Sequence, residues 1–245
     1  MILNDESGIG GVLRELMPVL ALGLRDSRLR GGDTAAVAYA QVLARMLRTE
    51  GDTASNEVVQ GVWAELVLIA HSTQPDIMVA AWHEDPDDIY DFALANERLE
   101  VKSARGAHRR HRFSSSQLPS RPGVELTVVS VLVQRVAGGS TLWDLLQLLG
   151  SRVNASVHAE AMRKTLAVVP LSALVELAYD SVSASATAAF FAGRDVPAIS
   201  LPRDVLSASW TADLANTRGL GQVSGGLASA AVQMSPVPLG TKQDA

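Results

Sequence analysis

The strongest constraint on the fold is one apolar segment, ELTVVSVLVQRV, at residues 125–136. It is rich in β-branched residues and lies between Pro122-Gly123 and Gly138-Gly139, so it is predicted to be a strand. Helical patterns precede and follow it, and weaker strand patterns lie upstream. The order of helix, three strands, basic segment, strand and helix predicts an α/β or α+β fold with a central mixed sheet flanked by helices.

The remaining elements are placed by their apolar period and by their turn residues. Helices are predicted at residues 11–24, 35–49, 57–71, 140–149, 154–165 and 171–177, and strands at residues 76–83, 89–94 and 98–103. Residues 102–121 are predicted to be a basic loop. Residues 1–50 are expected to form a helical extension on a core domain at 51–218, and the Gly/Ala/Ser/Pro-rich residues 219–245 are expected to form a flexible tail.

Composition excludes several classes of function. The chain has no cysteine, which rules out disulfides, thiolate zinc sites and a cysteine nucleophile. No basic leader and no apolar run of about 18 residues is present, so a cytoplasmic protein without a membrane span is expected. The net charge is −5, so any site for a polyanion must be a local patch.

Two acidic side chains are predicted to face each other on a β-hairpin. If Ala95-Asn96 is a two-residue loop, Phe92 pairs with Leu99 and Asp91 pairs with Glu100. Opposed carboxylates repel each other unless a cation lies between them. Mg²⁺ usually takes one or two protein carboxylates together with water and substrate phosphate, so a Mg²⁺ site that also accepts Mn²⁺ is predicted. A solvated surface hairpin is the alternative.

Two further side chains fit such a site. Lys102 follows Glu100 by two residues and points to the same face, where it could hold a water or a phosphate oxygen. Glu65 lies inside the apolar stripe of the helix at residues 57–71, and a buried glutamate is rare unless it is paired or bound. The alternative for Glu65 is an edge position that reaches water.

A local excess of positive charge follows the hairpin. Residues 102–121 contain six Lys or Arg and no acid, and positive groups beside paired carboxylates fit a phosphodiester substrate. A solvated basic loop is the alternative. The candidate contacts to such a substrate in this segment are Arg105, Arg109, Arg110 and Arg112.

Together these residues resemble the PD-(D/E)XK nuclease superfamily. Glu65 matches its helix acid, Asp91 its first motif acid, and Glu100-Val101-Lys102 its ExK half, although no proline precedes Asp91. The chain is more closely similar to a bacterial family described as "putative PD-(D/E)XK family member", linked to restriction and phage-defence gene clusters. The similar segments are GVWAELVLI, DIYDFALANERLEVKS, HRFSSSQL and GGSTLWDLLQLL, within residues 57–210.

The resemblance implies a Mg²⁺-dependent endonuclease acting on DNA through a restriction-endonuclease-like core. Asp91, Glu100 and the Val101 carbonyl would bind the metal, Lys102 would orient the attacking water, and Glu65 would assist through a metal-bound water. Gln117, in the SSSQL segment, would face the site and the DNA. The implied setting is a restriction or anti-phage system, with a helicase/ATPase or a methyltransferase as partner, and a homodimer is a further expectation.

Two alternatives remain open from the sequence. The first is a catalytically silent nuclease fold that binds DNA or acts as a scaffold subunit. The second is a different metal-dependent phosphoesterase that acts on RNA or on a nucleotide. Neither a G-x-x-x-x-G-K-[ST] loop, a G-x-G-x-x-G turn after a strand nor a G-x-S-x-G elbow occurs, which argues against other common enzyme classes.

Overall fold

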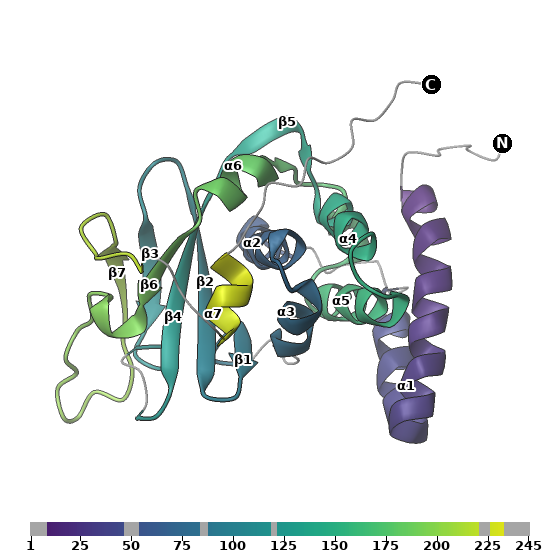
Figure 1. The fold of residues 1–245 in the computed structure, drawn as a ribbon, viewed down its shortest axis with the longest axis horizontal. Helices are drawn as coiled ribbons and strands as arrows, with labels where there is room; N and C mark the ends of the chain where they lie inside the picture. Colours follow the sequence, from purple (N-terminus) through teal and green to yellow (C-terminus); the bar gives the residue numbers. More distant parts are fainter. Residues whose placement is uncertain (1–8, 47–53, 84–87, 119–121, 221–225, 233–245) are drawn as a thin grey trace.

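A four-stranded mixed sheet forms the centre of the protein, in the order β1-β2-β4-β6 (Figure 1). The computed structural model describes residues 9–46, 54–83, 88–118, 122–220 and 226–232. Strand β2 runs antiparallel to β1 and parallel to β4, and β4 runs antiparallel to β6. The central strands are β1 (Phe92–Leu94), β2 (Glu97–Arg105), β4 (Glu125–Val133) and β6 (Ala189–Ala192). The predicted α/β class with a central mixed sheet is confirmed.

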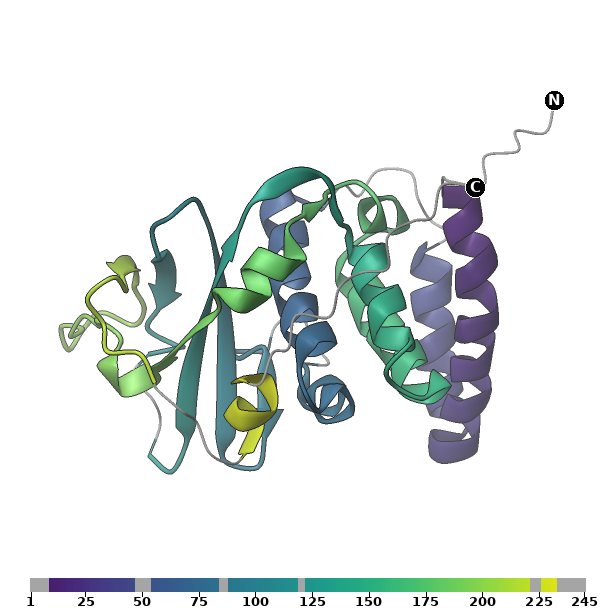
Figure 2. The same ribbon diagram turned by 45° about the horizontal axis from the view of Figure 1, so that its top comes forward.

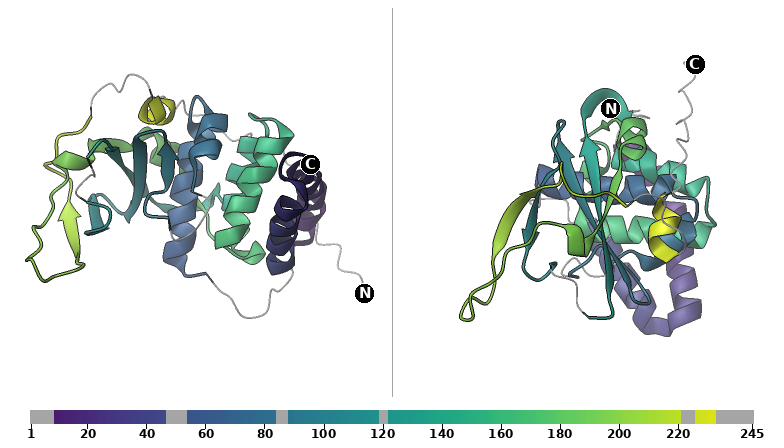
Figure 3. Two further views of the ribbon diagram at one scale, coloured as in Figure 1. Left: turned by 90° about the horizontal axis from the view of Figure 1, so that it is seen from below. Right: turned by 60° about the vertical axis from the view of Figure 1, so that its left-hand side comes forward.

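Layers of helices cover one face of this sheet, and a two-stranded ribbon covers the other. Helices α2, α3 and α7 lie nearest the sheet, α4 and α5 follow, and α1 is outermost (Figures 1 and 2). The view from below shows the same order (Figure 3). The helices are α1 (Ile9–Met46), α2 (Asn56–His71), α3 (Pro75–Ala81), α4 (Leu142–Gly150), α5 (Ala155–Val168), α6 (Ser181–Ala186) and α7 (Gly226–Val232), with 3₁₀ turns η1 (Leu171–Leu174) and η2 (Gly193–Asp195). The ribbon pairs β3 (Arg110–Ser114) with β7 (Ser209–Asp213), and β5 (Arg135–Ser140) follows β4.

The apolar run that predicted β4 is explained by burial on both faces. Val129 and Val131 pack against the helices, whereas Leu126 and Val128 pack against Phe113 of the ribbon. A strand covered on both sides reads as a continuous apolar stretch rather than as an alternating one. The ribbon therefore closes a second core over the face of β4 and β6 that the helices leave open.

Helix α2 is almost completely buried, which fixes its position under β2. Its first turn is capped by Ser55, whose hydroxyl accepts a hydrogen bond from Val58 N at 3.3 Å. The Trp63 indole donates to the carbonyl of Ser140 at 2.8 Å. The predicted helix at residues 57–71 is confirmed, and its glutamate, Glu65, is held in this buried setting.

Residues 76–83 were predicted to form a strand, and this prediction is wrong. They form helix α3 instead, with Pro75 in its first turn and Trp82 at its C-terminal cap. A short apolar run is compatible with either a buried strand or a buried helix, so periodicity could not decide between them. The proline at the start, which has no N–H to donate, favours a helix N-terminus.

The basic segment is also more ordered than predicted. Strand β2 continues to Arg105, and β3 follows within the segment that was expected to be a loop. His111 and Phe113 are buried while Arg110 and Arg112 are exposed, which is the alternation of a half-buried strand. The charged residues concealed this period in the sequence.

Helix α1 contains two helical segments that join at Gly32 and lie side by side (Figure 2). Gly32 has φ 68° and ψ −162°, a conformation that residues with a Cβ rarely adopt. The separate helices predicted at residues 11–24 and 35–49 match these two segments as far as Met46, and residues 47–49 lie outside the described ranges. Val12, Leu16 and Leu20 join the main core next to α5.

The expected flexible tail at residues 219–245 needs a correction. Residues 226–232 form α7, which packs on β2 and α3 and buries Leu227 completely. The Leu227 amide donates to Glu97 Oε2 at 2.6 Å. Residues 221–225 and 233–245 lie outside the described residues. Within the described ranges, no helix combines the length and hydropathy needed to cross a membrane.

Candidate active site

The hairpin that carries the candidate carboxylates has the predicted register. Phe92 pairs with Leu99 and Leu94 pairs with Glu97, around a two-residue turn. Ala95 has φ 50°, the one non-glycine residue with positive φ among those described. The turn therefore places a positive φ on Ala95, although Asn96 is the residue of the two that adopts a positive φ more readily.

Asp91 lies one residue before β1 rather than within it. Its Oδ2 accepts a hydrogen bond from Val101 N at 2.6 Å. Strand β1 pairs only with Glu97–Leu99 of β2, so the predicted pairing of Asp91 with Glu100 is not part of the ladder. The Asp91 side chain instead bonds to the edge of β2 beyond the end of β1. The N–H and C=O of one strand residue point to the same edge, so the Val101 carbonyl lies on the Asp91 side.

Glu100 is 3% exposed and lies at the centre of a cluster of polar side chains beneath the ribbon. Its Oε1 lies 2.6 Å from Lys102 Nζ and accepts from Gln117 Nε2 at 2.5 Å. Lys102 also donates to Gln117 Oε1 at 3.4 Å. Glu100 Oε2 is buried and has no hydrogen-bond partner within the described part of the chain. One carboxylate oxygen therefore remains available for a ligand.

Glu65 reaches the same region from α2. Its Oε2 accepts from Trp82 Nε1 at 2.6 Å and lies 3.2 Å from His83 Nε2. His83 is tied to the hairpin as well, because its amide donates to the Asp91 carbonyl at 2.8 Å. Glu65 is buried, as predicted, and the two side chains that hold it were not predicted.

The electrostatics of the acids favour a cation. Burial raises the pKa of Asp91 well above its usual range, and the negative charges of Glu65 and Glu100 raise it further. Burial also raises the pKa of Glu100, although the Lys102 charge opposes this effect. The ionised acids are therefore costly in the metal-free protein, and a bound cation would offset that cost.

These residues fit a metal that needs few protein ligands. No group of three or more His, Asp or Glu side chains gathers as a ready metal shell in the described ranges. Asp91, Glu100 and the Val101 carbonyl offer hard oxygen donors at one edge of β2, and Glu100 Oε2 is a buried acceptor without a partner. Mg²⁺ commonly keeps water and substrate oxygens in its remaining positions.

The predicted DNA-contacting arginines separate into two groups. Arg109 donates to Ser130 O at 2.7 Å and to Thr187 O at 2.5 Å, which ties the ribbon to the sheet. Arg105 donates to Gln60 Oε1 at 2.7 Å. These two have structural partners, whereas Arg110 pairs with Asp213 at 3.0 Å on the exposed face of β3. Arg112 is exposed on that same face.

Sequence reasoning missed Trp82 and His83, and it placed His111 in a basic loop rather than on a half-buried strand. The first two are the last residues of the segment that was assigned as a strand, so their contact with α2 was hidden by that assignment. His111 is 3% exposed, and its Nε2 lies 2.7 Å from Ser130 Oγ. Burial is the main cause that lowers the pKa of His111 to about 4. It is a neutral packing residue between ribbon and sheet.

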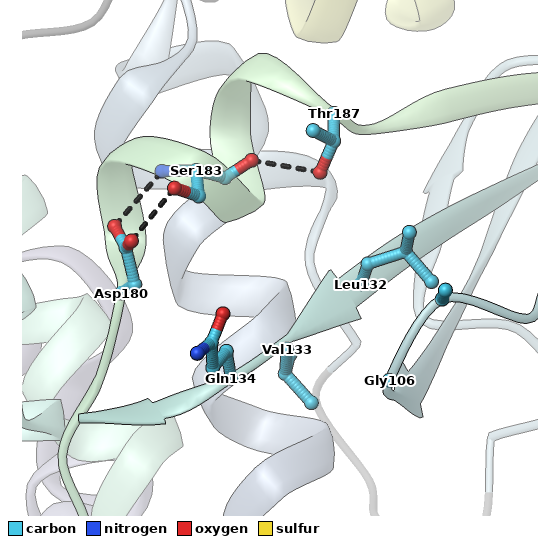
Figure 4. A pocket seen from close by; sticks show the side chains of 8 residues that line it. Gly106, Leu132, Val133, Gln134, Asp180, Ser183 and Thr187 are labelled. Carbon is cyan, nitrogen blue, oxygen red and sulfur yellow. Dashed lines mark hydrogen bonds between the residues drawn. The ribbon is translucent and has the colours of Figure 1, made fainter.

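The polar cluster on β2 is distinct from a hollow of ≈ 550 Å³ beyond the end of that strand (Figure 4). This hollow lies between Gly106, the end of β4 and α6. Asp180 faces Ser183, accepting from its amide at 2.9 Å and from its hydroxyl at 2.6 Å, so both carboxylate oxygens cap α6. No predicted site residue lines the hollow.

A comparison with protein families decides the relationship of this chain. The model of the family described as "Putative PD-(D/E)XK family member, (DUF4420)" matches residues 34–215. The chain belongs to this family. No match was found among curated proteins or among solved structures. Membership of the PD-(D/E)XK family indicates a nuclease that uses a divalent metal, and the candidate carboxylates lie inside the matched range.

Proposed function

We propose that this PD-(D/E)XK family member is a Mg²⁺-dependent endonuclease that hydrolyses DNA phosphodiester bonds, with Mn²⁺ able to replace Mg²⁺. The observation that carries the proposal is the buried Glu100 carboxylate, whose Oε2 has no partner in the described residues and whose Oε1 lies 2.6 Å from Lys102 Nζ. The raised pKa of Asp91 supports it, because burial and neighbouring acids favour a nearby cation.

Some residues of the site would bind the metal, and others would orient the reacting groups. Asp91, Glu100 and the Val101 carbonyl would hold the metal, which when bound lowers the pKa of a water and offsets charge on the scissile phosphate. Lys102 Nζ would donate to the attacking water or to a phosphate oxygen. Gln117 keeps the Glu100 side chain oriented through its 2.5 Å hydrogen bond.

Glu65 has a supporting place in this scheme. Trp82 and His83 fix its carboxylate, and its charge acts on both Asp91 and Glu100. It would accept a hydrogen bond from a water at the metal. Most of the rate enhancement would come from placement and electrostatics, as expected for phosphodiester cleavage.

Nicking of supercoiled plasmid tests the proposal. Wild-type protein should nick with Mg²⁺ or Mn²⁺ and not with a chelator present. Glu100→Gln and Lys102→Met should each reduce the rate by at least ~100-fold, because each removes a group that acts on the developing charge. Glu125→Gln is the matched control, since Glu125 is an exposed acid on the neighbouring strand.

Equal rates in the wild type and in both site variants would show that the nicking comes from elsewhere. A wild type that neither nicks DNA nor binds Mn²⁺ in calorimetry would favour the silent scaffold. Parallel reactions with single-stranded DNA and RNA determine which nucleic acid is the substrate, because a phosphoesterase for RNA would leave the plasmid intact.

We also propose that the enzyme serves in a bacterial restriction or anti-phage system, as a homodimer and beside a helicase/ATPase or a methyltransferase. The support is the family resemblance of its segments. Bacteria that express the complete gene cluster should resist phage infection, and Glu100→Gln should remove that resistance at equal protein level. Unchanged resistance with the variant would separate the defence role from the nuclease chemistry.

A further inference from the structure

A polar depression lies at the end of the β3–β7 ribbon, and its lining differs from that of the hollow beside α6. Its volume is ≈ 540 Å³. One wall comes from β3 and the turn after it, and the other comes from the start of β7 and the segment before it. The lining residues that carry donors are Arg112, Ser114, Ser115, Ser116, Ser207 and Ser209.

The two walls are joined by backbone hydrogen bonds, so the depression is preformed. Ser114 pairs with Ser209 in the ribbon, and the Ser115 amide donates to the Ala208 carbonyl at 2.9 Å. The Ala208 amide donates in return to Ser115 Oγ at 3.1 Å. Because Ser115 Oγ accepts that bond, its own hydroxyl hydrogen is left to donate elsewhere.

The lining presents donors and one positive charge, and it contains no carboxylate. Ser114 Oγ and Ser116 Oγ lie 2.7 Å apart, so one of these hydroxyls donates to the other and one hydrogen remains. Arg112 is exposed, and no acid pairs with it in the described residues. The neighbouring acid, Asp213, is already paired with Arg110. This chemistry recognises an anion with several acceptor oxygens.

The depression is connected to the candidate active site through Gln117. The Ser114 amide donates to Gln117 Oε1 at 3.3 Å, and Gln117 Nε2 donates to Glu100. A group bound by Ser114–Ser116 would therefore contact residues that directly precede Gln117, the residue that orients Glu100. A phosphate of the strand under cleavage, separate from the scissile one, fits that position.

We propose that this serine–arginine depression binds a backbone phosphate of the DNA substrate next to the scissile phosphate. The inference rests on the proposed nuclease function and adds a substrate-binding subsite to it. Arg112 supplies the charge, and the serine hydroxyls of both walls supply neutral donors. Leu206, 97% exposed at the rim, would contact the adjoining sugar or base. The segment that carries it, between η2 and β7, extends away from the sheet (Figure 3).

Binding of a fluorescent DNA duplex without divalent metal tests the subsite, because no cleavage then interferes. Arg112→Gln should weaken binding by ~3- to 10-fold at low salt. It should also reduce the slope of log K against log salt concentration by about 0.9, the value for one lost phosphate contact. Arg135→Gln, which removes an exposed arginine on β5, should leave the slope unchanged.

Duplexes that carry a single neutral methylphosphonate linkage identify the phosphate. At the position that occupies the depression, this linkage should weaken DNA binding by the wild type and should weaken binding by Arg112→Gln less, since the charged contact is already lost in that variant. A double variant, Ser207→Ala with Ser209→Ala, should show the same position-dependent loss. These serines are exposed, so the double variant should unfold at the same temperature as the wild type, which checks that its fold is intact.

The outcomes separate this subsite from the proposed function. If the wild type nicks plasmid and binds DNA but Arg112→Gln matches it in affinity and slope, the subsite is refuted and the nuclease stands. If Arg112→Gln weakens binding while no nicking occurs, Arg112 still contacts a DNA phosphate, but the nuclease is refuted, and with it the place of that phosphate beside a scissile one. A wild type that does not bind DNA refutes both.

Discussion

Asp91 shows how a single residue can oppose the stability of the fold that holds it. It is half-buried, its Oδ2 accepts from Val101 N, and two other acids act on its charge. Its pKa in the folded protein is raised above that in the unfolded chain. The folded state therefore keeps the proton to higher pH, so the contribution of Asp91 to stability is largest at low pH and is lost as pH rises through the raised pKa.

Asp91→Asn should therefore raise the thermal midpoint of the metal-free protein at neutral pH, since the amide oxygen can still accept from Val101 N without carrying a charge. The shift should be about 2–4 °C for each kcal/mol of repulsion relieved. Calorimetry with a chelator present measures it. Added Mn²⁺ should stabilise the wild type and leave the variant unchanged. A variant that unfolds earlier than the wild type would contradict this account of the site.

His111, buried between the ribbon and the sheet, should make the stability of the protein fall at acidic pH. Its folded pKa is lowered to about 4, below the ordinary value of 6.5, so the unfolded chain binds the proton first as pH falls. Stability present above pH ~6.5 should be lost progressively towards pH ~4, by on the order of 3 kcal/mol. Urea unfolding of wild type and His111→Gln across this range should show a steeper loss for the wild type. Parallel pH profiles would exclude the effect.

At the scale of elements, the hairpin could be predicted closely and its surroundings could not. The register around Ala95-Asn96 follows from turn length and strand period, which are local properties. The contact of Trp82 with Glu65 depends on α3, whose apolar run has no distinctive period. Arg109 likewise shows its partners, Ser130 and Thr187, only when the ribbon is placed on the sheet.

The hairpin turn offers a stability test at this scale. Ala95 has φ 50°, so Ala95→Gly should relieve strain and stabilise the protein by ~1 kcal/mol. Ala93→Gly is the matched control: Ala93 is exposed within β1 and has extended backbone, so its replacement should destabilise by roughly 0.5–1 kcal/mol. Urea unfolding distinguishes the two, and equal destabilisation by both changes would argue against the positive φ.

At the scale of the whole molecule, distant parts of the chain close the fold around β2. Sequence composition suggested a flexible tail because residues 219–245 are rich in small residues. In α7 those same small residues permit close packing, with Ala230 and Ala231 buried beside Leu227. The Ala230 carbonyl accepts from the Thr73 amide at 3.2 Å. Such a docking depends on a complementary surface elsewhere, which no local pattern reveals.

Leu227→Ala should therefore cost about 2–5 kcal/mol, the usual range for a fully buried leucine. Denaturant unfolding measures the loss. Ser229→Ala is the control within the same helix, because Ser229 is only half-buried and should change stability by less than ~0.5 kcal/mol. A neutral Leu227→Ala would mean that α7 does not hold its place on β2 in solution.

The ion pair between Lys102 and Glu100 has a consequence for the order of assembly. An ammonium group already neutralises Glu100 Oε1, so an arriving dication must compete with a resident positive charge. The dication should therefore bind more weakly to the free protein than to its complex with nucleic acid. An incoming anionic strand would draw the lysine towards itself and leave the acid to the dication, so nucleic acid and metal should each increase the affinity of the protein for the other.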